Sequence, residues 1–325
     1  MVFIVLVNWK GAFDTIRCLE SIFRSSYKQF KVIVVDNLSQ DGSVEIIRAW
    51  AERRLSLAEH GKNPVELLSF PPIDIEIPCL QIAAYQLSFD DGAGWGALIE
   101  KHQLLIVANS ANAGFGAGNN VGLKLIKLAN ECDHFWLLNN DTVIKPDTLG
   151  TLVRFSADHP RTVVGSILRY YDNPNQIQAA GGGSFSRYTG IVKTMLARSE
   201  CELDFINGAS FFAPVAYLNE VGGFDENIFM YFEENEYCIR GKKAGFSFRC
   251  SEAVVFHKMG GSKFGSERAW QQQFKNKFYT MRKHFGFGLW QLFYFASLII
   301  NAYILSQNQG KRHAAQSVIR EYIKR

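Results

Sequence analysis

Three carboxylates that could take up a proton lie within four residues of one another. Glu233, Glu234 and Glu236 begin a stretch that Gly245 can end, which predicts a helix with these acids at the positive end of its dipole. One acid is enough to cap a helix, so the surplus favours a general base that deprotonates a hydroxyl as it attacks. Helix capping is the alternative for either Glu233 or Glu234.

A metal site is indicated where Asp141 follows an apolar strand. Asn139, Asn140 and Asp141 close a buried run, and a carboxylate beside amide oxygens suits a hard cation that also binds a diphosphate. The alternative is an Asx-turn into the helix that Pro146 opens. His257 ends another apolar strand, where a lone histidine is more often structural. Its assignment as a ligand therefore depends on its pairing with Asp141.

A glycine-rich loop at residues 112–122 separates a strand from a helix. Its glycines, among them Gly114 and Gly116, can bring backbone N–H groups and a helix N-terminus close to an anionic ligand. A tight turn is the alternative. The loop follows the third strand and not the first, which argues against a dinucleotide-binding fold. It also lacks the Gly-Lys-Ser/Thr sequence of a P-loop.

Alternating strands and helices must position these residues. Apolar runs at residues 2–7, 31–35, 104–108 and 135–138 predict buried strands with helices between them. This alternation predicts an α/β fold with a mostly parallel sheet, whose ligands bind beyond the carboxyl ends of the strands. The polar clusters at these ends are Asn8, residues 36–41, residues 112–119 and residues 139–141.

Composition limits the classes of protein that this chain can represent. The 325 residues carry a formal net charge of +4, and no basic run is interleaved with aromatic residues before the C-terminus, so nucleic-acid binding is not expected. The six cysteines form no Cys-x-x-Cys pair, which favours reduced thiols over a zinc site or a disulfide framework. The apolar N-terminus is short and lacks a basic start, which predicts a buried strand and a cytoplasmic protein.

Together the motifs resemble those of glycosyltransferase family 2, particularly its rhamnosyltransferase-like bacterial members, over roughly residues 1–285. Nine short segments match in the right order: residues 7–9, 35–43, 112–119, 137–142, 207–209, 222–225, 233–240, 243–246 and 257–262. The resemblance implies a GT-A, Rossmann-like fold with a mostly parallel central sheet flanked by helices. It also implies an inverting single displacement, with Mn²⁺ or Mg²⁺ on the diphosphate of the donor.

The resemblance assigns a role to most of the polar clusters. By position, Asp36 would hydrogen-bond the pyrimidine base of the donor, with Asn8 and Ser39 nearby. Asp141 would bind the metal and His257 would be a second ligand. The metal would offset the charge of the diphosphate as it leaves. The remaining donor-binding residues would be Gly114, Gly116, Asn119, Asn139 and Asn140.

Two positions depart from the usual family pattern. Glu234 would be the base that takes the acceptor proton, but it stands where the family usually has aspartate, so this base is one methylene longer. The metal-binding triplet begins with Asn139, as is common among the rhamnosyltransferase-like members, which leaves Asp141 as its single carboxylate. Modest metal affinity is therefore expected.

The expected activity is transfer of a sugar, with rhamnosyl as one candidate, from a dTDP- or UDP-sugar. The acceptor would be a saccharide or lipid-linked saccharide, and the process would be assembly of a bacterial surface polysaccharide. A sugar nucleotidyltransferase is one alternative, but residues 8–11 do not supply the glycine loop with lysine or arginine that it would carry after the first strand. The other alternative is a non-catalytic nucleotide-sugar-binding protein, which would bind the donor without turnover.

The C-terminal part of the chain is expected to form a helical extension. We predict a GT-A domain over residues 1–270, with an insertion at about residues 51–101, and a helical segment over residues 271–325. Residues 285–310 contain no charged side chain and are flanked by basic residues, which favours a helix lying in an anionic membrane surface at the inner face of the cell membrane. A dimer or core helix and a true span are the alternatives. Acceptor contact and homodimerisation are the roles considered for the insertion.

Overall fold

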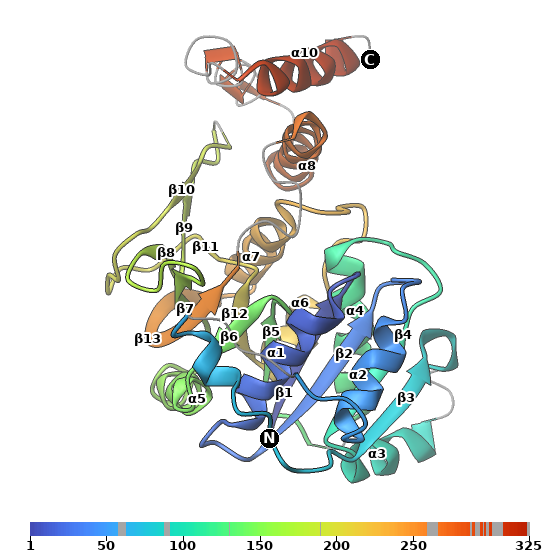
Figure 1. Cartoon of the computed structure of the whole chain (residues 1–325). Coiled ribbons are helices and arrows are strands. Elements are labelled where there is room, and N and C mark those ends of the chain that lie inside the picture. Colours follow the sequence, from blue (N-terminus) through green and yellow to red (C-terminus); the bar gives the residue numbers. More distant parts are fainter. Residues whose placement is uncertain are drawn as a thin grey trace.

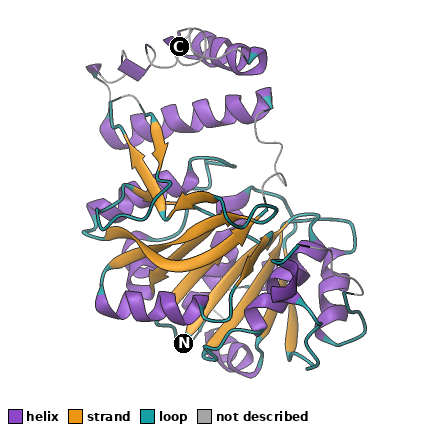
Figure 2. Cartoon of the chain, turned by 60° about the vertical axis from the view of Figure 1, so that its left-hand side comes forward, coloured by secondary structure: helices purple, strands orange, loops and turns teal. Residues whose placement is uncertain are grey.

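A mixed β-sheet with helices on both faces forms the centre of the molecule in this computed structural model (Figures 1 and 2). The structure describes residues 1–57, 63–87, 92–129, 131–188, 190–258, 266–286, 288–289, 293–294, 296, 299–300 and 308–323. The strands of the sheet are β1 (Val2–Asn8), β2 (Phe30–Asp36), β3 (Cys79–Ala83), β4 (Leu104–Ala108), β5 (His134–Leu138), β6 (Thr142–Ile144), β7 (Thr162–Tyr170), β8 (Ile177–Ala180), β12 (Ser210–Pro214) and β13 (Ser247–His257). Their order is β3-β4-β2-β1-β5-β12-β7-β13-β6, and β8 pairs with β7 outside this path.

The first half of the sheet is parallel, as the sequence predicts. Strand β1 pairs in parallel with both β2 and β5, and β4 pairs in parallel with β2 and β3. The register sets Asn8 directly beside Asp36 at the carboxyl ends of their strands. The four predicted strands are therefore confirmed, and their polar ends share one edge of the sheet.

The second half of the sheet mixes both directions. Strand β12 is antiparallel to its neighbours β5 and β7, whereas β13 is parallel to β7 and antiparallel to β6. The pairing of β13 with β6 sets His257 opposite Thr142, the residue that follows Asp141. The last strand thus returns its carboxyl end to the loop after β5.

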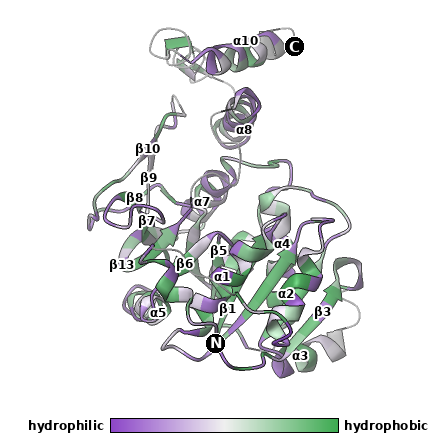
Figure 3. Ribbon diagram, viewed as in Figure 1, coloured by the Kyte–Doolittle hydropathy of each residue, from purple (hydrophilic) through white to green (hydrophobic). Residues whose placement is uncertain are grey.

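The central strands β1 and β2 are coloured as hydrophobic along most of their length (Figure 3), because buried clusters cover both faces of the sheet. Val2, Ile4 and Leu6 of β1 face one core, and the alternate residues Phe3 and Val5 face the other. The helices of the first core are α1 (Ala12–Phe23), α2 (Ser43–Ala51) and α5 (Thr148–Asp158), and those of the second are α4 (Phe115–Leu128), α6 (Val215–Val221) and α7 (Glu233–Lys243).

The expected insertion contributes to the sheet itself. It contains the 3-10 helices η1 (Glu66–Ser69) and η2 (Ala84–Gln86), strand β3 and helix α3 (Gly92–Lys101). Among the described strands β3 pairs only with β4, so it forms an edge of the sheet there. Part of the segment is thus integral to the fold, and its role in acceptor contact or dimerisation stays a prediction.

A small sheet and two long helices lie at the other end of the molecule (Figure 1). Strands β9 (Gly182–Phe185), β10 (Val192–Thr194) and β11 (Phe205–Ile206) form the small sheet. The helices are α8 (Glu267–Phe285) and α10 (Gln309–Ile323), which pack together through a small apolar cluster. The predicted domain boundary at residue 270 falls inside α8 and stays a prediction.

The membrane prediction concerns a segment that is described only in part. Most of residues 285–310 lie outside the described residues, so the predicted interfacial helix is not tested there. Within the described ranges, none of the helices combines the length and the apolar character that crossing a membrane requires.

Candidate functional site

A buried hydrogen-bond network joins the ends of β1 and β2. Asn8 Nδ2 donates to Asp36 Oδ1 at 2.7 Å and to Ser39 Oγ at 3.2 Å, and the Ser39 backbone N–H donates to Asp36 Oδ2 at 3.0 Å. All three side chains are buried, so these bonds hold the Asp36 carboxylate in one orientation. The structure therefore brings together three of the residues predicted to bind the donor.

Asn140 connects this network to the loop after β5. Its Nδ2 donates to Thr15 Oγ1 at 2.9 Å and to Asn8 Oδ1 at 3.3 Å, and Thr15 Oγ1 donates to the same Asn8 oxygen. Thr15 lies on α1 and was missed by the sequence analysis. The signal for it was weak, since a threonine on the inner face of a helix is ordinary. Two of the predicted polar clusters are thus physically connected.

The glycine loop is shaped by close packing against a distant segment. Gly114 has φ of +101°, and a Cβ there would stand 2.0 Å from the Phe229 carbonyl oxygen. A Cβ on Gly116 would stand 3.1 Å from Phe224. The Phe115 N–H donates to the Phe229 carbonyl at 3.0 Å. These contacts account for both glycines, and their role in donor binding stays a prediction.

Two asparagines near this loop differ in their surroundings. Asn119 is buried, and its Nδ2 donates to the Phe115 carbonyl of its own helix at 3.0 Å. Asn37 was not singled out from the sequence, although it directly follows Asp36. Its Nδ2 donates to Asn112 Oδ1 at 3.1 Å and to the Gly114 carbonyl at 2.9 Å. Asn37 therefore links the end of β2 to the glycine loop.

The structure brings Asp141 and His257 together, as the metal hypothesis requires. His257 Nε2 lies 3.3 Å from Asp141 Oδ1 and 3.3 Å from Asn139 Nδ2. The Lys258 backbone N–H donates to the Asp141 carbonyl at 3.0 Å, which ties the end of β13 to the loop after β5. Both side chains of the pair are mostly buried but keep some contact with solvent.

The hydrogen bonds around His257 suit a cation. Its Nδ1 lies 2.9 Å from Gln178 Oε1, and this acceptor assigns the ring proton to Nδ1 and leaves a lone pair on Nε2. That lone pair faces the Asp141 carboxylate and the Asn139 Nδ2 group, which can donate to it. Asn139 Oδ1 is buried and finds no hydrogen-bond partner among the described residues. An imidazole nitrogen and a carboxylate therefore lie together beside the Asn139 amide, and these residues fit a divalent metal.

The metal site would be sparse in charged ligands. Within the described ranges, no group of three or more His, Cys, Asp or Glu side chains is placed to hold a metal ion. Asp141 and His257 are a pair, supplemented by the amide of Asn139. Gln178, which orients the histidine ring, was missed by the sequence analysis because nothing in its local pattern marks it.

Glu234 lies beside the loop that contacts Asn139. The position of a Cβ on Gly208 would be 3.8 Å from Glu234 Cβ, and the neighbouring Ala209 carbonyl accepts the Asn139 backbone N–H at 3.1 Å. Burial raises the pKa of Glu234 to about 7. Burial and the charge of Glu234 also raise the pKa of Glu233, whose Oε2 has no hydrogen-bond partner within the described ranges. A carboxyl group that titrates near neutrality is suited to accept a proton.

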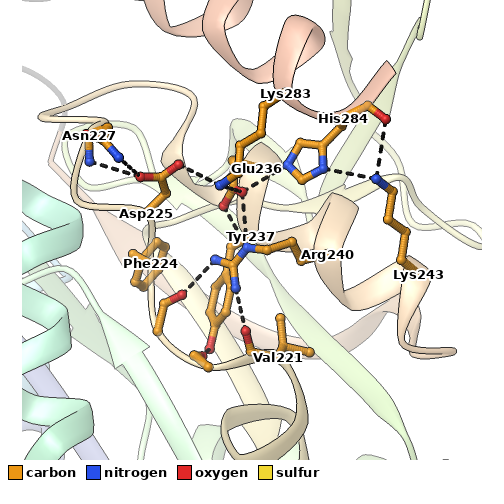
Figure 4. A network of polar contacts seen from close by, with 12 residues as sticks. Val221, Phe224, Asp225, Asn227, Glu236, Tyr237, Arg240, Lys243, Lys283 and His284 are labelled. Atoms are coloured by element: carbon orange, nitrogen blue, oxygen red, sulfur yellow. Dashed lines mark hydrogen bonds and ion pairs between the residues drawn. The ribbon is translucent and has the colours of Figure 1, made fainter. Parts of the chain in front are cut away.

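The third acid of the segment, Glu236, has a structural environment (Figure 4). It is fully buried and accepts hydrogen bonds from Arg240 Nε at 2.9 Å, Lys283 Nζ at 2.8 Å and His284 Nε2 at 2.9 Å. Burial alone would raise its pKa, but the bond from His284 and the charges of Arg240 and Lys283 lower it. Lys283 also pairs with Asp225 at 2.7 Å. Glu236 therefore joins α7 to α8 and is no candidate for the base.

Comparisons with known proteins match most of the segments that carry these residues. A model described as "Glycosyltransferase like family 2" matches residues 97–281, and one described as "Glycosyl transferase family 2" matches residues 6–64. The rhamnosyltransferase WbbL of Escherichia coli K12 is 25% identical over 159 residues, which cover 44% of this chain. The match spans only 59% of the length of that relative.

Solved structures share the architecture at low sequence identity. A mannosyltransferase from Pyrobaculum calidifontis, in complex with GDP-Man and Mn²⁺, superposes with a TM-score of 0.57 at 13% identity, covering 99% of this chain and 79% of that one. Residues 1–349 of TarS from S. aureus give a TM-score of 0.50 at 12% identity, covering 94% of this chain and 70% of that one. The predicted fold, a mostly parallel sheet flanked by helices as in GT-A proteins, is thereby confirmed.

Proposed function

The chain belongs to glycosyltransferase family 2, and we propose that it transfers a sugar from a nucleoside-diphosphate donor to a hydroxyl of an acceptor. The observation that carries this proposal is the approach of Asp141 and His257, with the Asn139 side chain against the histidine ring, beside the loop next to Glu234. These groups provide a place for a diphosphate leaving group and a proton acceptor at one edge of the sheet.

The donor would bind at the ends of β1 and β2. The fixed Asp36 carboxylate, held by Asn8 and Ser39, is suited to accept an N–H from a nucleobase, and we propose a dTDP- or UDP-sugar. The weak similarity to a rhamnosyltransferase supports rhamnosyl as the first sugar to test. Gly114, Gly116 and the other loop residues would line the same pocket.

Asp141, His257 and Asn139 would hold Mn²⁺ or Mg²⁺. The structure of the mannosyltransferase with Mn²⁺ supports a divalent ion. When bound, such an ion offsets the charge of the departing diphosphate. Gln178 would hold the histidine ring so that Nε2 faces the ion. With one carboxylate among these residues, we expect modest affinity.

Glu234 would act as the base of an inverting single displacement. The acceptor hydroxyl oxygen forms a bond to the anomeric carbon, and the bond from that carbon to the diphosphate oxygen breaks on the opposite face. The bonding electrons leave with the diphosphate, and the hydroxyl proton passes to the Glu234 carboxylate. The raised pKa of Glu234, about 7, matches a base that works near neutral pH.

The acceptor would be a saccharide or lipid-linked saccharide. Leu289, Phe293, Ile299 and Ile300 are exposed apolar side chains beside the C-terminal helices, which supports peripheral contact with a membrane surface. We propose that the chain uses such an acceptor during assembly of a bacterial surface polysaccharide.

Nucleotide release tests the proposal directly. Nucleotide sugars are screened for release of UDP or dTDP with and without Mn²⁺, and Asp141→Ala should abolish the metal-dependent release. Asp158→Ala, which removes an exposed carboxylate at the end of α5, is the matched control and should leave release unchanged. Turnover in Asp141→Ala equal to that of the wild type would refute the metal assignment. Donor binding without any release, unaffected by Glu234→Gln, would indicate a non-catalytic protein instead.

A further inference from the structure

Lys277 on α8 is a partly buried lysine without a carboxylate partner. Its Nζ lies 5.7 Å from the centre of the Phe232 ring, and the described residues give it no ion pair or hydrogen bond. By contrast, Lys283 on the same helix pairs with both Asp225 and Glu236. Buried lysines are normally paired, so an unpaired one calls for an anion from outside the chain.

A second lysine strengthens the positive charge at this place. Burial and the charge of Lys311 on α10 lower the pKa of Lys277 to about 8. Lys311 Nζ lies 4.9 Å from the ring of Trp270, which is also on α8. Two ammonium groups that repel each other are stabilised together by a ligand with more than one negative charge, and a phosphate group meets this requirement.

The lysine lies close to the segment that carries the proposed base. Phe232 is the residue immediately before α7, so Lys277 contacts the residue that precedes Glu233 and Glu234. Its neighbour Asn276 donates from Nδ2 to the carbonyls of Met230 and Tyr231, both at 2.8 Å. Helix α8 therefore supports the loop that leads into the base. The residues proposed for the donor and the metal lie at the ends of β1, β2, β5 and β13 and in the glycine loop at the start of α4.

Apolar side chains surround the same place. The β9–β10 hairpin reaches toward α8 (Figure 2), and a Cβ on Gly190 of its turn would stand 2.8 Å from Lys277 Cδ and 3.5 Å from Tyr294. Tyr294 is buried, but Leu289 and Phe293 from the same stretch are exposed at 72% and 54%. Positive charge and exposed apolar surface thus lie next to each other.

We propose that Lys277 and Lys311 form a binding site for the phosphate group of an amphiphilic acceptor, whose apolar chain rests on the exposed side chains around Leu289 and Phe293. This inference rests on the proposed glycosyl transfer and adds the chemical class of the acceptor. The phosphate would stand beside the loop before Glu234, which leaves the attached hydroxyl-bearing group on the side of the base.

Calorimetric titration of the full chain with three probes below their micellar concentrations tests the site. Dodecyl phosphate carries both features, inorganic phosphate lacks the chain, and dodecyl maltoside lacks the phosphate. Dodecyl phosphate should bind most tightly, and Lys277→Met should weaken it tenfold or more, because a charge-assisted hydrogen bond is lost. Lys193→Met, an exposed lysine of β10, is the matched control and should change its affinity less than twofold.

Three results would overturn the proposal. The first is that Lys277→Met binds dodecyl phosphate as tightly as the wild type does. The other two are that the wild type binds inorganic phosphate, or dodecyl maltoside, as tightly as it binds dodecyl phosphate. Lys277→Met should fold, since it removes an unpaired and partly buried charge, and a melting temperature no lower than that of the wild type verifies this. The titration requires no turnover, and Asp141→Ala should still bind dodecyl phosphate. Failure of this site is therefore distinguishable from failure of the proposed transfer.

Discussion

The raised pKa of Glu234 predicts both how activity depends on pH and how Glu234→Gln alters stability. Activity requires the carboxylate, so kcat/KM should rise with pH and level off above about 7. At one unit below this value about one tenth of the molecules carry the charge, so the rate should fall about tenfold for each further unit. Glu234→Gln should lose about 10²- to 10⁴-fold in kcat at pH 8, because the amide accepts no proton.

The raised pKa of Glu234 also lowers the stability of the folded protein at neutral pH. The direction of this effect follows from how many protons the folded and the unfolded chain bind. Glu234 has an ordinary pKa of 4.5 and a folded value of about 7, so between these values the folded chain holds a proton that the unfolded chain has lost. The free energy of unfolding therefore decreases as pH rises through this window. The full shift corresponds to about 3 kcal/mol, and we expect about 1 to 2 kcal/mol because the side chain is only partly buried.

Urea unfolding at pH 5 and pH 8, together with initial rates of nucleotide release, measures both effects. Glu234→Gln should be more stable than the wild type at pH 8, and this gain should be much smaller at pH 5. Glu233→Gln is the matched control. The pKa of Glu233 is raised well above its usual value, so the amide replaces an acid that is already neutral. In this variant kcat/KM should still rise with pH around 7. The reasoning would be refuted if kcat/KM of the wild type rose with pH around 4.5, or if Glu234→Gln were less stable than the wild type at pH 8.

Three further predictions concern the scaffold and the metal. Gly122→Ala should lower the free energy of unfolding by about 1 to 3 kcal/mol, because the added Cβ would stand 2.4 Å from a β1 side chain. The control is Gly94→Ala, whose Cβ would have no described atom within 4 Å and which should not destabilise the protein. Urea titration compares the two variants. Glu236→Ala should lower the free energy of unfolding by about 1 to 3 kcal/mol, because Arg240, Lys283 and His284 lose the buried acceptor that they share. The exposed Glu220→Ala should change little in the same assay. Gln178→Leu should weaken Mn²⁺ binding about 10- to 100-fold by releasing the histidine ring, and equal affinity by metal titration would contradict that role.

The parallel half of the fold could be predicted because its signals are local. Each of β1, β2, β4 and β5 is a continuous apolar run that ends in polar residues, and burial between two cores requires this pattern. The approach of Asp141 to His257 could be expected only through the family resemblance, since 116 positions separate them and β13 must return beside β6.

The remaining features depend on contacts that no local pattern encodes. Strand β6 has three residues, and β3 lies in a segment rich in prolines, so neither shows a clear strand signal. Gly114 and Gly116 were interpreted through a ligand, but their close approach to Phe224 and Phe229 is a property of the folded chain. Glu236 could be told apart from Glu234 only after its partners on α8 were placed beside it.

The support that Asn276 gives to the loop before α7 affects how this protein can be shortened. Tyr231 and Phe232 hold φ values of +69° and +76°, which side-chain-bearing residues rarely adopt, and the Asn276 amide bonds two carbonyls of that strained stretch. A truncated version ending at residue 270 would retain the donor-side residues but would lose this amide and the Lys283 and His284 side chains that donate to Glu236. The smallest active fragment should accordingly extend through Phe285, so α8 belongs to the catalytic unit and cannot be trimmed as an appendage.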